Sequence, residues 1–191
     1  MGKEIRYEIR DNYNFYKILL EERKSIFQEV IEIKEIKKNN KNILETSEII
    51  KHSSDNSKIE LIVNVKINDY KFFQFKLKCK ELSDIPFFRY DNDGETHRNY
   101  DEDEIPLRGQ SVNTPHFHFF NEKGINIAYQ TATLKDEAEK KALEDINLCI
   151  AHYFHEANIR LNGDDFPKVS ILPGSLNLDF TQDDPNSNIR F

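Results

Sequence analysis

The stretch of sequence that decides the fold is Ile59–Cys79, which reads IELIVNVKINDYKFFQFKLKC. Apolar residues occupy every second position in two runs, Ile59–Ile67 and Phe73–Cys79. Because strict alternation is typical of strands with one buried face, this stretch predicts an antiparallel hairpin. Both apolar sets are odd-numbered, so we expect Val65 to face Phe73 across a three-residue loop.

The outward face of the second predicted strand carries a row of lysines, Lys76, Lys78 and Lys80. Such a row suits contacts with phosphate groups, and Lys76 and Lys78 are therefore candidate substrate-binding residues. The same row is also typical of solvated faces and of strand edges that resist pairing with other chains. Both interpretations stay open at the level of the sequence.

Further strands and helices are expected on both sides of the hairpin. Asn14–Ser25 has helical spacing of its apolar residues, and Ala132–Arg160 predicts a long helix with one apolar stripe. Strands are expected at Ile31–Ile33, Ile43–Lys51, Ile85–Asp91, His116–Asn121, Ile125–Gln130 and Val169–Leu172, although Gln28–Lys38 is also compatible with a longer first helix. The predicted fold class is α+β, with a single antiparallel β-sheet, an N-terminal helix and a long C-terminal helix packed on one face.

Length and composition predict one domain at residues 1–180, followed by an acidic, flexible tail at residues 181–191. An aromatic fraction of 12% supplies core material. No apolar run approaches the roughly 18 residues of a membrane-spanning helix, and the first residues lack the apolar centre of a signal peptide. Cys79 and Cys149 lie in apolar patterns that predict buried free thiols. We therefore expect a cytoplasmic protein without membrane association.

The net charge of -7 is unevenly distributed along the chain. The first 80 residues hold 17 Lys and Arg against 13 Asp and Glu, and the remainder holds 10 against 21. Non-specific affinity for duplex DNA comes from neutralising phosphates, so a chain this acidic is a poor general DNA binder. A local basic face remains compatible with this distribution.

The residues best suited to chemistry lie between the predicted strands Ile85–Asp91 and His116–Asn121. They are Arg89, Asp91, His97, Asn99, His116 and His118. Histidine exchanges protons near neutral pH, arginine matches phosphate geometry, and aspartate orients an imidazole. This set predicts a metal-independent phosphodiesterase or ribonuclease with His97, His116, His118, Arg89 and Asp91 as catalytic residues. Asn99 and Tyr129 join Lys76 and Lys78 as candidate substrate-binding residues.

Two other interpretations of these residues stay open. His97, His116 and His118 are also suited to hold a divalent metal, although the preferred interpretation has no cofactor. A purely structural interpretation pairs Arg89 with Asp91 and lets the histidines bond backbone carbonyls. In a strand, His116 and His118 share one face while Phe117 and Phe119 take the other, so the two imidazoles point away from the core.

The central stretch resembles a known sequence pattern. Arg89-Tyr90-Asp91 with Gly94, His97 and Asn99, followed by Pro115-His116-Phe117-His118, is similar to R-x-D-x-x-G-x-x-H-x-N … P-H-x-H. This pattern marks an uncharacterised family of bacterial and mobile-element proteins, and it more distantly resembles toxins of the TumE type. The resemblance implies a site at these positions and a role in phage defence or a toxin-antitoxin system.

Two classes of function are therefore predicted. In the first, the chain is a conflict-system enzyme that acts on nucleic acid, with RNA as the preferred partner. In the second, it is a non-catalytic inhibitor whose acidic segments, Asp101–Glu104 and the tail, occupy a basic groove on a protein partner. The clustering of proton-transfer residues favours the first class, and the acidic net charge favours the second.

Overall fold

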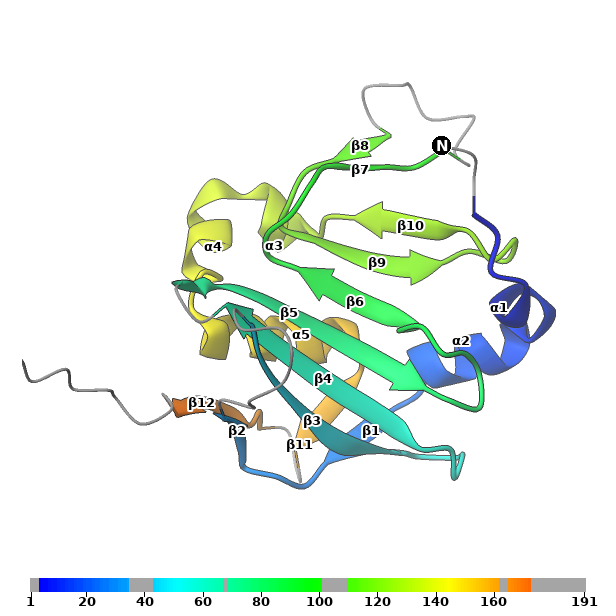
Figure 1. The fold of residues 1–191 in the computed structure, drawn as a ribbon, viewed down its shortest axis with the longest axis horizontal. Coiled ribbons are helices and arrows are strands. Elements are labelled where there is room, and N and C mark those ends of the chain that lie inside the picture. Colours follow the sequence, from blue (N-terminus) through cyan, green and yellow to red (C-terminus); the bar gives the residue numbers. More distant parts are fainter. Residues whose placement is uncertain (1–3, 35–42, 67–68, 101–109, 162–164, 173–191) are drawn as a thin grey trace, which may run out of the picture.

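The structure, a computed structural model, describes residues 4–34, 43–66, 69–100, 110–161 and 165–172. Its main sheet contains the strands β1 (Lys24–Ile26), β3 (Ile43–His52), β4 (Ile59–Lys66), β5 (Asp69–Cys79), β6 (Phe88–Asp91), β9 (His116–Phe120), β10 (Asn126–Tyr129) and β11 (Ile159–Leu161). Their order across the sheet is β10-β9-β6-β5-β4-β3-β1-β11 (Figure 1). Neighbouring strands are antiparallel except β1 and β11, which are parallel.

Two small sheets and five helices complete the described part of the chain. Strand β2 (Val30–Lys34) pairs in parallel with β12 (Lys168–Leu172), and β7 (His97–Arg98) pairs antiparallel with β8 (Ser111–Val112). The helices are α1 (Tyr7–Asp11), α2 (Tyr13–Glu21), α3 (Ala132–Lys135), α4 (Glu137–Ala142) and α5 (Ile146–Glu156). Among the described residues, no helix combines the length and apolar character needed to cross a bilayer.

The predicted hairpin is confirmed by the pairing of β4 with β5. Val65 faces Phe73 as expected, and the same register extends back to Ile59 opposite Cys79. The register shifts after Val65, where Lys66 pairs with Asp69, so the connection is tighter than the predicted three-residue loop. A β-bulge of this kind lets a short turn join two strands without reversing their buried faces.

The predicted single antiparallel sheet with a long C-terminal helix is wrong. The main sheet is mixed, because β11 joins its edge in parallel to β1, and Ile159–Arg160 lies in that strand rather than in a helix. The expected helix is divided into α3, α4 and α5. Asp136 accepts hydrogen bonds from the backbone of Ala138 and Glu139, and Asp145 accepts from Asn147 and Leu148, so each aspartate begins a new helix.

Helix α5 covers the apolar face of the sheet, behind β4 and β5 in the view of Figure 1. Its Tyr153 is fully buried, and its ring centroid lies 5.2 Å from that of Phe75 and 5.5 Å from that of Phe88. Phe117 stacks against the same ring at 6.2 Å. The predicted burial of the free thiols Cys79 and Cys149 is confirmed on this side of the sheet. The opposite, more polar face carries Gln74, Lys76 and Lys78 on β5.

Lys24 is a buried cation at the end of helix α2. Its Nζ donates to the carbonyl oxygens of Leu19, Leu20 and Glu22 at 2.8, 3.0 and 2.8 Å. These carbonyls lie in the last turn of the helix, where no intrahelical donor reaches them and where the helix dipole favours a positive charge. Burial lowers the pKa of Lys24 to about 7.

Candidate functional site

The candidate site lies on the polar face of the sheet, where β6 and β9 are neighbours. Their register places Arg89 opposite His118 and Asp91 opposite His116. Because side chains alternate along a strand, all four share one face, while Tyr90 and Phe117 point into the core with their ring centroids 4.9 Å apart. The prediction that His116 and His118 share a face opposite Phe117 is confirmed.

Asp91, His116 and His118 form a buried cluster of polar side chains. His116 Nε2 lies 2.8 Å from His118 Nε2, and His118 Nε2 lies 3.1 Å from Asp91 Oδ2. Arg89 Nε is 2.8 Å from the same Asp91 oxygen. That contact is an ion pair without the alignment of a hydrogen bond, since Arg89 Nε has no hydrogen-bond partner within the described ranges. His118 Nδ1 lies 2.6 Å from Asn126 Oδ1 on β10.

A third imidazole reaches the cluster from the small β7–β8 sheet. The ring centroid of His97 is 4.9 Å from that of His118 and 6.3 Å from that of His116, so all three predicted histidines meet. Burial, followed by the charges of His118 and His116, lowers the pKa of His97 to about 4. His97 is therefore a neutral imidazole at neutral pH, able to accept a proton.

The electrostatics of the cluster favour an ionised Asp91. Burial raises the pKa of Asp91, but its contact with His118 and the charge of Arg89 outweigh this effect and hold the pKa below its ordinary value. Burial lowers the pKa of His116, and the nearby His118 lowers it further. The Asp91 carboxylate is therefore close to His116, whose imidazole resists protonation.

Asn99 holds β7 against the edge of the main sheet. Its side-chain amide donates to the carbonyl of Ala128 at 2.8 Å, and its side-chain oxygen accepts from the Ala128 amide at 2.9 Å. Ala128 lies on β10, the edge strand, so Asn99 pairs with backbone groups that no neighbouring strand reaches. Asn99, predicted to bind substrate, is placed where it positions His97 two residues away.

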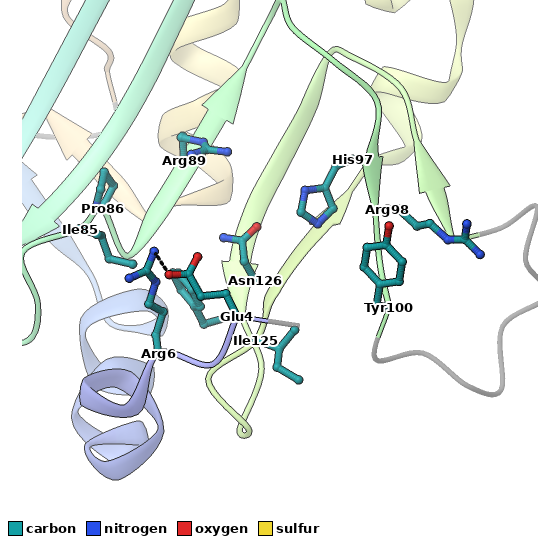
Figure 2. A pocket seen from close by; sticks show the side chains of 11 residues that line it. Glu4, Arg6, Ile85, Pro86, Arg89, His97, Arg98, Tyr100, Ile125 and Asn126 are labelled. Carbon is teal, nitrogen blue, oxygen red and sulfur yellow. Dashed lines mark ion pairs between the residues drawn. The ribbon is translucent and has the colours of Figure 1, made fainter. Parts of the chain in front are cut away.

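A cavity of about 400 Å³ opens beside the cluster. It is lined by Glu4, Arg6, Ile85, Pro86, Arg89, His97, Arg98, Tyr100, Phe120, Ile125 and Asn126. Figure 2 shows Asn126 between Arg89 and His97, with the Glu4–Arg6 ion pair below and to the left of Asn126 in this view. His116 and His118 are only 2% and 3% exposed, so Arg89, His97 and Asn126 connect the buried cluster to this space.

Three arginines give the cavity its chemical character. Arg89 comes from β6, Arg98 from β7, and Arg6 from the segment that precedes helix α1. Arg6 is held by the β9–β10 turn, because its backbone amide donates to the Gly124 carbonyl at 2.8 Å. Gly124 has φ +72°, and a Cβ at this position would lie 2.4 Å from the Arg6 carbonyl oxygen. Only glycine fits this approach without strain.

The remaining predicted substrate-binding residues are less close to the cluster. Lys76 lies opposite Arg89 on the polar face, and burial lowers its pKa. Lys78 is one step further along β5, with its Nζ 3.9 Å from Asp84. Tyr129 lies on the core face, where it stacks on Phe117 and donates its hydroxyl to Glu156 at 3.1 Å.

Sequence reasoning did not find Arg6, Arg98 or Asn126 as site residues. Arg6 is an isolated arginine, Arg98 occupies a variable position of the pattern between His97 and Asn99, and Asn126 is one of many asparagines. These residues are recognised only because the fold brings the segment before α1, β7 and β10 together around one cavity. The acidic segment Asp101–Glu104 and the tail at residues 181–191 lie outside the described residues.

A scan against protein-family models and searches of curated proteins and of solved structures return no match for this chain. The chemistry of the cluster and the lining of the cavity are therefore the basis on which a function is assigned.

Proposed function

We propose that this chain binds a nucleic-acid phosphodiester in the arginine-lined cavity and cleaves it, with RNA as the preferred substrate. The observation that carries the proposal is the placement of Arg6, Arg89, Arg98 and a neutral imidazole, His97, around one cavity. Guanidinium groups bind phosphate oxygens through paired hydrogen bonds. A cavity of about 400 Å³ is large enough for a nucleotide-sized ligand.

The proposed reaction uses the substrate's own hydroxyl as the nucleophile. His97, neutral at pH 7, takes the proton of an RNA 2′-hydroxyl. The 2′-oxygen then forms a bond to phosphorus while the bond to the 5′-oxygen breaks, and water at the cavity mouth protonates the leaving oxygen. Arg89 stabilises the charge that develops on the phosphate, and Asp91 fixes the direction of its guanidinium through their ion pair.

The proposed reaction has specific products, which follow from the attacking and leaving groups. A 2′-hydroxyl nucleophile yields a 2′,3′-cyclic phosphate and a 5′-hydroxyl, and DNA of the same sequence stays intact because it lacks the nucleophile. The resemblance of the central stretch to conflict-system proteins supports the same substrate class, since toxins and defence proteins of this kind meet RNA in the host cell.

The test compares labelled RNA and DNA of one sequence with purified wild type, Arg89→Ala and His97→Ala. We expect RNA cleavage by the wild type, loss of at least two orders of magnitude in rate for either variant, and no DNA cleavage. Arg10→Ala, an exposed arginine paired with Asp11 on helix α1, is the matched control and should keep the wild-type rate. Equal cleavage of DNA, or full activity of Arg89→Ala, would refute the mechanism.

A further inference from the structure

The three buried members of the cluster have the spacing of ligands that share one metal ion. One potential ligand atom from each of Asp91, His116 and His118 lies within 4.8 Å of the other two. The two closest separations are 2.8 Å between the imidazole nitrogens and 3.1 Å from His118 to Asp91. Two ligands that each lie about 2.0–2.1 Å from an ion, at right angles or tetrahedral angles, are roughly 2.8–3.4 Å apart.

The hydrogen-bond directions at His118 also favour a cation between these atoms. Asn126 Oδ1 is an acceptor 2.6 Å from His118 Nδ1, so Nδ1 carries the hydrogen in this contact. In the neutral ring, Nε2 then presents a lone pair toward the Asp91 carboxylate and toward His116 Nε2. Lone pairs that converge in a buried place repel one another unless a proton or a metal ion lies between them.

An extra proton on His118 leaves part of the cluster unsatisfied. Among the described residues, the buried Asp91 Oδ1 has no hydrogen-bond partner. A proton on His118 Nε2 pairs with Asp91 Oδ2 and does nothing for Oδ1. A metal ion balances the negative charge of the whole carboxylate. Leaving a buried carboxylate oxygen without a partner costs free energy.

The surroundings of the cluster match those of ligands held for a metal. A ligating histidine commonly donates its other ring nitrogen to an oxygen that fixes its tautomer, which is what Asn126 does for His118. Arg89 holds Asp91 in one orientation from the other side. The set differs from the three-histidine arrangement considered from the sequence, because Asp91 takes the place of His97.

We propose that Asp91, His116 and His118 bind one divalent transition-metal ion. Two imidazoles and one carboxylate form a donor set suited to Zn²⁺ and Fe²⁺, and three protein ligands leave coordination positions open. Arg89 and His97 connect the cluster to the cavity, so a phosphate bound in the cavity lies near the ion. The inference does not rest on the proposed function, because ion binding is measured without substrate.

The experiment titrates chelator-treated, dialysed protein with Zn²⁺ by calorimetry, and with Co²⁺ by visible absorption, which reports coordination geometry. We expect one ion per chain in the wild type. Asp91→Asn and His116→Gln each remove a ligand and should weaken binding by at least 100-fold, while Asn126→Ala removes the orienting contact and should weaken it roughly 10–100-fold. His155→Gln, an exposed histidine on helix α5, is the matched control and should bind as the wild type does.

Two results would overturn the metal site. One is a folded wild-type protein that binds no Zn²⁺ at millimolar concentration, which would assign the cation in the cluster to a proton on His118. The other is binding that His116→Gln and Asp91→Asn leave unchanged while His155→Gln removes it, which would place the ion on the surface. Circular dichroism of each variant confirms that it is folded. RNA cleavage is scored separately with and without chelator, so a failure of the metal site and a failure of the proposed function give different patterns.

Discussion

Replacing Asn99 with alanine tests whether this residue positions the site or binds the substrate. The side chain makes two hydrogen bonds, at 2.8 and 2.9 Å, to the backbone of Ala128. Asn99 is 5% exposed and Ala128 is 2% exposed, so water does not readily replace either bond. Each bond contributes roughly 1 kcal/mol, and an unpaired buried backbone group costs about 1–3 kcal/mol, which together predict a loss of about 2–4 kcal/mol in the free energy of unfolding.

The assay is chemical denaturation of wild type, Asn99→Ala and a matched control, Asn92→Ala. Asn92 makes one exposed hydrogen bond to the Lys71 carbonyl at 2.9 Å, so its loss should cost less than about 1 kcal/mol. Native-state hydrogen exchange supplies a second measurement, because the Ala128 amide loses its acceptor and should exchange faster in Asn99→Ala.

The positioning role of Asn99 is refuted by one combination of results. If Asn99→Ala keeps the wild-type free energy of unfolding and the wild-type exchange rate at Ala128, while RNA binding alone weakens, then Asn99 is a substrate contact as the sequence predicted. A parallel loss of stability and of His97-dependent cleavage supports the positioning role, since β7 carries both residues.

Three further predictions concern the scaffold around the site. Tyr153→Ala should lower the free energy of unfolding by about 3–5 kcal/mol, measured by urea denaturation, because it empties a fully buried position among Phe75, Phe88 and Phe117. Gly124→Ala should lower the free energy of unfolding by at least about 1–2 kcal/mol because of the positive φ alone. The new Cβ should also push against the Arg6 carbonyl and so weaken RNA binding. An unchanged melting temperature would contradict this prediction. The pKa of Lys24 is about 7 in the folded protein and 10.5 in the unfolded chain, so the unfolded chain binds more protons between these pH values. The free energy of unfolding should therefore rise with pH between pH 7 and 10.5. Relative to Lys24→Met, the rise should be up to about 1.4 kcal/mol per pH unit. A pH-independent difference between those two proteins would show that the three carbonyls hold the Lys24 proton.

Local patterns in the sequence predicted the centre of the sheet well. The alternation of Ile59–Cys79 predicted both the hairpin and the pairing of Val65 with Phe73, because one buried face fixes the register. The same reasoning placed His116 and His118 together on a strand face. For the described part of Gln28–Lys38, strand β2 decides between the alternatives, since Val30–Lys34 pairs with β12 rather than continuing a helix.

Features that depend on distant contacts could not be predicted in this way. The parallel pairing of β1 with β11 joins residues more than 130 positions apart, and no local pattern announces it. The division of the predicted long helix has a local cause, because Asp136 and Asp145 cap new helices. The continuous apolar periodicity of Ala132–Arg160 favoured one helix and hid this signal. Lys24 and Ser25 fall within the predicted helix Asn14–Ser25, but α2 ends at Glu21 and these two residues lie in β1, which pairs with the distant strands β3 and β11. The cavity could not be predicted because it depends on contacts between residues far apart in the sequence, such as the contact that holds Arg6 against Gly124.

The alternation along β6 and β9 ties the chemistry of this protein to its hydrophobic interior. Arg89 and Asp91 flank Tyr90, and His116 and His118 flank Phe117, so the same short strands supply both reactive groups and core aromatics. Inserting or deleting one residue in either strand would turn charged groups inward and rings outward together. Evolution can therefore vary the cavity through Arg6, Arg98 and the loops that carry them, but it can remodel the central cluster only by exchanging side chains in place.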